Sequence, residues 1–164
     1  TPGRLRMSPV EHRWLRERFL ESVDGTDTTG RERFYISRQG LEKRCVTNFE
    51  EIRGVLEDFD FKIVRPEEMS VGEQVRKFSK GKLFVGPRGS GLHNTMFARD
   101  ASVVEIAPPN TRLHIQFLLD NALGHEYTYM FGSDTPEIVQ NKDVNFRVDP
   151  EILRFVISRV LSDS

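Results

Sequence analysis

The chain has little cysteine and no long apolar run. Cys45 is the only cysteine, so no disulfide can form within the chain. The single thiol and the absence of Asn-x-Ser/Thr sequons favour a cytoplasmic protein. No apolar run approaches the roughly 20 residues of a membrane helix, and residues 1–14 have no apolar signal-like core. We therefore expect no membrane segment in this chain.

The chain also has no excess of charge of one sign. It holds 24 basic and 25 acidic residues, a net charge of -1, which gives no general attraction to nucleic acid. Any anion site must be local. The length of 164 residues predicts a single domain over 1–164, with an N-terminal helix and loop in 1–30 and a core in 31–164. Because Thr1 replaces an initiator Met, we expect a piece of a longer protein.

Three ligand signatures are missing as well. No pair of histidines or cysteines has metal-ligand spacing such as H-x-x-x-H or C-x-x-C, so we expect no metal site. The chain has neither the dinucleotide G-x-G-x-x-G nor a Walker loop with its Lys-Ser/Thr.

What is present is a regular alternation of apolar strands and amphipathic helices. Strands are expected at 33–38, 61–66, 82–87, 102–109, 125–132 and 145–149, and helices at 8–23, 48–59, 70–81, 92–98, 112–124 and 149–161. Alternation of this kind is typical of right-handed βαβ units. The fold class is therefore α/β, a Rossmann-like three-layer sandwich with a mostly parallel sheet. Ligands of such sheets bind beyond the carboxyl ends of the strands.

Several polar residues have structural explanations. Ser8, Asn48, Ser70 and Asp149 stand where helix N-caps are expected, and Val10, Trp14, Leu15 and Phe19 are expected to form the apolar face of the first helix. Gln74 falls on the apolar face of its helix, which indicates a buried hydrogen-bonding residue rather than a ligand.

The loop Gly86–Asn94, which we call the glycine loop, joins a strand to a helix and reads GPRGSGLHN. Its glycines allow backbone amides to approach a ligand, and the following helix directs its positive end there, which suits a phosphate or diphosphate. Ser90, Arg88 and Asn94 add polar donors. On spacing alone, a tight turn that merely needs glycine is an equally good interpretation.

Other candidates follow the ends of neighbouring strands. Arg38 and Arg44 can reach the same sheet edge, whereas Lys43 is more simply a solvated residue. Glu105 lies within the apolar run VVEIAPP, and a buried carboxylate there requires a partner such as a ribose diol, a backbone amide or an arginine. His93 adjoins the glycine loop and is the one weak candidate for an acid–base group.

The order of these motifs resembles the family 61 glycosyltransferases, also described as DUF563. The stretches concerned run from Phe34 to Pro108: ISR followed by Arg44 and NFEE, PEEMSVGEQVRKF, VGPRGSGLHNTMFA and VVEIAPP. The resemblance implies one half of a GT-B fold, the C-terminal domain that binds a nucleoside diphosphate sugar, with a missing N-terminal acceptor domain. It implies metal-independent, inverting transfer to a glycan or protein hydroxyl in polysaccharide biosynthesis, and a lumenal location for a eukaryotic member.

Residue by residue, the resemblance supports a substrate-binding set. The set comprises Arg38, Arg44, Arg88, Gly89, Ser90, Gly91, Leu92, Asn94 and Glu105. Arg88 stands where the family usually has histidine, and Ser90 where it has a small residue. An arginine cannot shuttle protons near neutral pH, so Arg88 is expected to stabilise charge instead. A non-catalytic Rossmann-like binding module and a pyruvyl transferase are the alternative functions.

Overall fold

The computed structural model describes residues 7–109, 111, 115–133 and 143–163. Its strands are β1 (Glu32–Ile36), β2 (Phe61–Val64), β3 (Gly81–Pro87), β4 (Ser102–Ala107) and β5 (Glu126–Phe131). Its α-helices are α1 (Pro9–Ser22), α2 (Phe49–Asp58), α3 (Val71–Phe78), α4 (Ile115–Leu123) and α5 (Pro150–Asp163), and two 3-10 helices are η1 (Pro66–Glu68) and η2 (Ser90–Phe97). Residues 112–114 of the expected helix at 112–124 lie outside the described residues.

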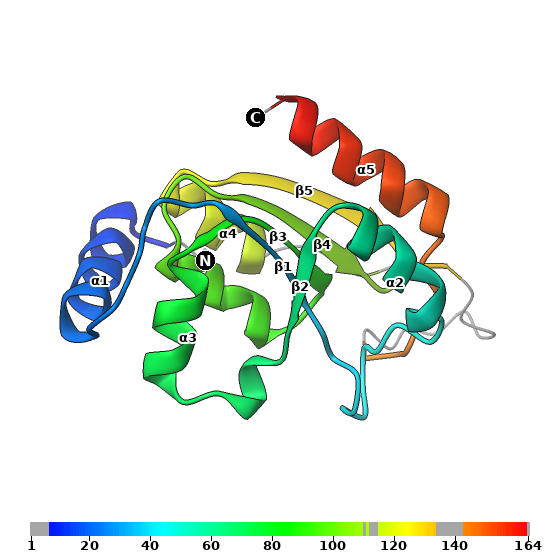
Figure 1. The fold of residues 1–164 in the computed structure, drawn as a ribbon, viewed down its shortest axis with the longest axis horizontal. Coiled ribbons are helices and arrows are strands. Elements are labelled where there is room, and N and C mark those ends of the chain that lie inside the picture. The colour runs from blue at the N-terminus through cyan, green and yellow to red at the C-terminus, as the bar shows by residue number, and fades with distance from the viewer. Residues whose placement is uncertain (1–6, 110, 112–114, 134–142, 164) are drawn as a thin grey trace, which may run out of the picture.

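The five strands form one parallel sheet in the order β2-β1-β3-β4-β5 (Figure 1). The chain moves outward from β1 to β2, then returns past β1 and continues from β3 to β5 in the other direction. The order therefore reverses between β1 and β3. In doubly wound folds this reversal opens a crevice at the carboxyl ends of the two strands.

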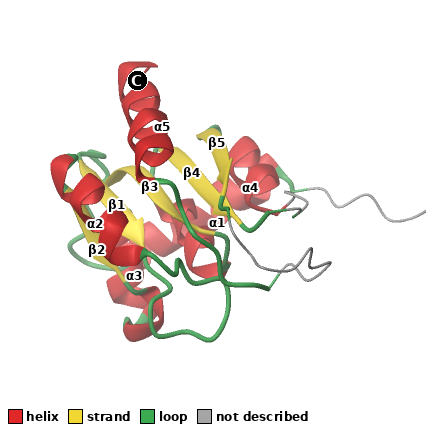
Figure 2. Cartoon of the chain, turned by 90° about the vertical axis from the view of Figure 1, so that its right-hand side faces the viewer, coloured by secondary structure: helices red, strands yellow, loops and turns green. Residues whose placement is uncertain are grey.

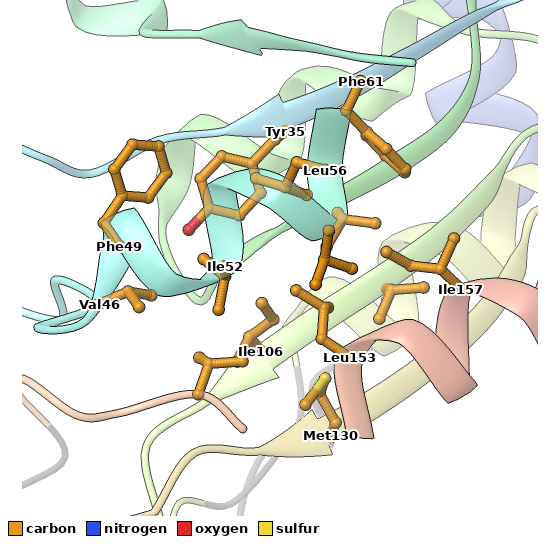
Figure 3. Close-up of a cluster of buried hydrophobic side chains, with 14 of the residues drawn as sticks. Tyr35, Val46, Phe49, Ile52, Leu56, Phe61, Ile106, Met130, Leu153 and Ile157 are labelled. Carbon is orange, nitrogen blue, oxygen red and sulfur yellow. The ribbon is translucent and has the colours of Figure 1, made fainter. Parts of the chain in front are cut away.

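Helices cover both faces of the sheet, which confirms the α/β, three-layer Rossmann-like prediction. On one face, α2 and α5 pack together, and Figure 3 shows Ile52 and Leu56 of α2 facing Leu153 and Ile157 of α5 over Ile106. On the other face, α1, α3 and η2 pack around Phe34, Phe78 and Phe84, and α4 packs against η2 and α1. Figure 2 shows α4 beside β5. No helix in the described part of the chain is long and apolar enough to cross a membrane.

The cap predictions are confirmed for three helices and corrected for one. Ser8 Oγ accepts from Glu11 N, Ser70 and Glu73 form a reciprocal capping box, and Asp149 Oδ1 accepts from two amides at the start of α5. Asn48 precedes α2 but makes no side-chain cap. Its amide instead pairs in both directions with the backbone of Val148, at 2.8 and 2.9 Å, because that neighbouring segment is buried against it.

The expected strand at 145–149 is wrong. Phe146 and Arg147 make only isolated bridges, to Val46 and Ser133, and add no strand to the sheet. Alternating apolar residues produced the expectation, but Phe146 is buried in the cluster beneath α2 and α5, with its ring against Gly132 at the end of β5, and only single bridges pair its segment. The segment is a connection in which Phe146 and Val148 are buried and the residues between and beside them are exposed.

The expected apolar face of the first helix is also wrong in part. Val10, Trp14 and Leu15 are exposed, and Trp14 keeps 61% of its surface. The buried residues of α1 are Arg16 and Leu20, which lie on a different face of the helix from Val10 and Trp14. Arg16 Nη1 donates to the carbonyl oxygen of Ala98 at 3.1 Å, so the packed face includes a buried polar contact beside Leu20.

Candidate functional site

The glycine loop leaves β3 at the point where strand order reverses. Its helix is the 3-10 helix η2, which begins at Ser90, and not the expected α-helix at 92–98. A Cβ atom on Gly86 would lie 2.9 Å from the carbonyl oxygen of Ile36, and one on Gly89 would lie 2.4 Å from Arg38 Nη1. Packing against Ile36 of β1 therefore requires a glycine at position 86, whereas a side chain at position 89 would meet only the movable end of Arg38.

The loop separates two clefts that share Gly89 and Ser90. The first cleft, of about 320 Å³, lies between the ends of β1 and β3 and has a mixed lining, with the polar residues Ser37, Arg38, Glu67, Gln74 and Asn94 and the apolar residues Ile36, Leu41, Pro66 and Leu92, besides Gly91. The second cleft, of about 350 Å³, is mostly polar and is lined by Arg44, Arg88, His93, Glu105, Ile115, Gln116 and Asp143 besides the shared pair. Every predicted substrate-binding residue lines one cleft or both.

Arginines approach the loop from both sides. Arg38 Nε donates to the carbonyl oxygen of Lys43 at 3.1 Å, which holds the guanidinium against Gly89. Burial lowers the pKa of Arg38, and the charge of Arg44 lowers it further. Both side chains stay cationic in proteins, so two like charges flank the same turn. An anion placed between them relieves that repulsion.

The second cleft already contains carboxylates. Arg44 Nε lies 3.5 Å from Asp143 Oδ1, and Arg88 Nε lies 3.9 Å from Glu105 Oε1. Lys43, expected to be a solvated residue, is exposed and reaches Asp143 only at 3.9 Å.

Glu105 finds protein partners inside the fold. The hydroxyl of Tyr127 donates to Glu105 Oε2 at 2.5 Å, and Arg88 approaches the other oxygen. Burial raises the pKa of Glu105, while the hydrogen bond from Tyr127 and the charge of Arg88 oppose the rise. An arginine was one of three partners expected from the sequence. A ribose diol is not required to satisfy this carboxylate, which orients Arg88 in the cleft.

His93 lines the second cleft and belongs to a polar chain that sequence reasoning missed. Its Nδ1 lies 2.8 Å from Gln116 Oε1, and Gln116 Nε2 donates to Asp120 Oδ2 at 2.9 Å. Gln116 and Asp120 stand four residues apart on α4, a spacing that places both on one helix face. That spacing was the available signal, but no local pattern links it to His93.

Ser70, which precedes α3, and Gln74 within it make hydrogen bonds of the kind expected from sequence, although Gln74 is half-buried and not buried. Ser70 caps the helix. Gln74 Nε2 donates to the carbonyl oxygens of Pro66 and Met69 at 2.9 and 3.0 Å, and so closes the side wall of the first cleft. Within the residues that the structure describes, no group of three His, Cys, Asp or Glu side chains is placed to hold a metal ion.

Comparison with known proteins decides the family. Residues 2–112 match the family model described as Glycosyltransferase 61, which covers more than half of the chain. The chain belongs to glycosyltransferase family 61. A comparison with curated proteins finds no match. The matched region of this glycosyltransferase contains β1, the glycine loop and β4, whereas Gln116 and Asp143 of the second cleft lie beyond it.

Proposed function

We propose that this domain binds a nucleoside diphosphate sugar, with the diphosphate at the Gly89–Ser90 turn. The observation that carries the proposal is the position of that turn, between two clefts at the reversal of strand order, with Arg38 on one side and Arg44 and Arg88 on the other. Family membership supplies the activity class, sugar transfer. The geometry supports a diphosphate because a fork of guanidinium donors suits phosphate oxygens.

The lining of the clefts suggests how the donor lies. The first cleft offers the apolar surfaces of Ile36, Pro66 and Leu92 to a nucleobase. The polar lining of the second cleft suits the hydroxyl groups of a sugar. The anomeric carbon then lies near His93, and the bond to be broken lies beside Arg44 and Arg88. These cations stabilise the negative charge of the departing diphosphate during an inverting transfer to a glycan or protein hydroxyl, in polysaccharide biosynthesis.

We further propose that the transfer needs no metal ion, since arginines supply the positive charge, and that the acceptor is held by a second, N-terminal domain. The donor-binding domain alone then binds donor weakly and turns over little. A cytoplasmic location belongs to the same proposal.

Calorimetric titration with UDP, GDP and their sugars tests donor binding. We expect one of these nucleotides to bind, with an affinity unchanged by EDTA. Replacing Arg38 with Gln should weaken binding about tenfold or more, the loss of one charge-assisted hydrogen bond. Arg18→Gln is the matched control, because Arg18 lies exposed on α1 and pairs with Glu21. Absence of binding to all of these ligands at millimolar concentration would overturn the proposal.

A further inference from the structure

A chain of polar side chains runs from the second cleft into the core. It starts at His93, passes through Gln116 and ends at Asp120, whose side chain is completely buried. Thr95 Oγ1 braces the chain, since it accepts from Gln116 Nε2 at 3.1 Å and donates to Asp120 Oδ1 at 3.4 Å. Gln116 and Thr95 are themselves buried, which makes each of these hydrogen bonds costly to lose.

The acceptor character of Asp120 fixes the orientation of Gln116. An ionised carboxylate only accepts hydrogen bonds, so the amide group of Gln116 must turn its NH₂ toward Asp120. The buried His125 ring, 3.1 Å from Asp120 Oδ1, gives that carboxylate a further donor. The carbonyl oxygen of Gln116 is thereby turned toward His93 and can only accept.

The orientation of Gln116 in turn fixes the tautomer of His93. Because Gln116 Oε1 faces Nδ1 at 2.8 Å, the hydrogen of a neutral His93 ring belongs on Nδ1. The lone pair then resides on Nε2. Among the described residues His93 Nε2 has no hydrogen-bond partner, and the residue lines the cleft together with Arg44, Arg88, Glu105 and Asp143.

We propose that Gln116 is a positioning residue that holds His93 with its hydrogen on Nδ1, so that Nε2 accepts the proton of the acceptor hydroxyl. The inference rests on the proposed function and names the general base for the proposed sugar transfer. The hydroxyl oxygen bonds to the anomeric carbon as the bond from that carbon to the diphosphate oxygen breaks. The electron pair leaves with the diphosphate, the proton passes to Nε2, and the imidazolium returns it to water after release.

The tautomer of His93 is measured directly by two-bond ¹⁵N–¹H spectra of the ring, recorded at increasing pH until its chemical shifts stop changing, which marks the neutral ring. We expect a protonated Nδ1 and an unprotonated Nε2 in the wild-type chain. Gln116→Met should remove this preference, whereas Gln74→Met, a matched change on α3, should leave it. His12, whose Nδ1 faces the Ser8 carbonyl oxygen at 2.9 Å on α1, serves as an internal reference.

A wild-type spectrum with the hydrogen on Nε2 overturns the proposal, even if the Gln116 variant does not fold. An unchanged tautomer in a folded Gln116→Met variant overturns the role of Gln116. The spectra need no nucleotide, so their outcome is separate from a failure of donor binding.

Kinetics test the proton transfer itself. With the nucleotide sugar that calorimetry selects, and with a chain that includes the proposed acceptor domain, His93→Gln should lower kcat by about 10²–10⁴-fold and leave the donor Kd unchanged. Gln116→Met should lower kcat by less and also leave that Kd unchanged. An unchanged kcat in His93→Gln would show that another group takes the proton. Loss of donor affinity in that variant would instead make His93 a binding residue and overturn the inference.

Discussion

The Glu105 carboxylate lies within an apolar strand. The contacts of two side chains reduce the free-energy cost of burying its negative charge. Tyr127 and Arg88 stabilise the ionised form, yet burial dominates and the pKa is raised. The folded state therefore holds a proton on Glu105 more tightly than the unfolded chain does. Its contribution to stability is greatest below the ordinary glutamate pKa of about 4.3 and falls as the pH rises through the raised value.

Replacing Glu105 with Gln tests this dependence. The amide is neutral at every pH and can still accept from Tyr127, so we expect the Tm of E105Q relative to wild type to rise as the pH increases from about 4 to 8. Thermal unfolding at a series of pH values measures the difference. Glu57→Gln, an exposed change on α2, provides the control. A Tm difference that falls with pH would mean that Arg88 outweighs burial.

Two glycines of the loop should respond differently to alanine. A Cβ on Gly86 meets the backbone of Ile36, which cannot yield, so Gly86→Ala should lower the free energy of unfolding by about 1–3 kcal/mol. A Cβ on Gly89 meets only the flexible end of Arg38, so Gly89→Ala should cost less stability and weaken nucleotide binding. Denaturant unfolding and calorimetry separate the two effects. Equal destabilisation by both variants would contradict this account.

At the scale of elements, the capping box formed by Ser70 and Glu73 stabilises the start of α3, which lies beside the first cleft. Ser70→Ala should lower the free energy of unfolding by about 1 kcal/mol through loss of the cap and leave nucleotide affinity unchanged. Ser90→Ala at the start of η2 should weaken nucleotide binding and leave the free energy of unfolding unchanged, since Ser90 is exposed and borders both clefts. Urea unfolding and calorimetric titration of the two variants provide the comparison. Weaker binding in Ser70→Ala would give α3 a direct part in the site.

The elements that can be predicted from sequence are those specified by the residues within the element itself. The apolar runs of β3 and β4 and the glycines between them specify strand, turn and strand, so the loop and its arginines were placed at the correct sheet edge. The error at 145–149 arises from contacts distant in sequence, because Phe146 packs among Val46, the helices α2 and α5, and Gly132 after β5. The pairing of Asn48 with Val148 and of His93 with Gln116 likewise spans long stretches of chain, so no window of sequence contains it.

At the scale of the whole molecule, the family match ends at residue 112 but the fold does not. Beyond that residue, α4 and β5 cover and extend the sheet at β4, and α5 supplies Leu153 and Ile157 to the core. A chain ending at residue 112 therefore exposes apolar surface and leaves β4 as an open edge.

We expect that shortened chain to lack a cooperative thermal transition and to associate, as measured by circular dichroism and size-exclusion chromatography. The point change Leu153→Ala should keep the fold and lower the free energy of unfolding by about 2–5 kcal/mol. A shortened chain that melts cooperatively would locate the stable core within the matched region alone.

The exposed position of Trp14 has a practical consequence. It is the only tryptophan, and it lies on the outer face of α1 with its indole largely in water. Its fluorescence in the folded protein should already resemble that of a solvated indole, so unfolding will change the emission little. The tyrosine and phenylalanine rings packed around the sheet, among them Tyr35, Phe34, Phe78 and Phe84, are better optical reporters, through near-ultraviolet circular dichroism.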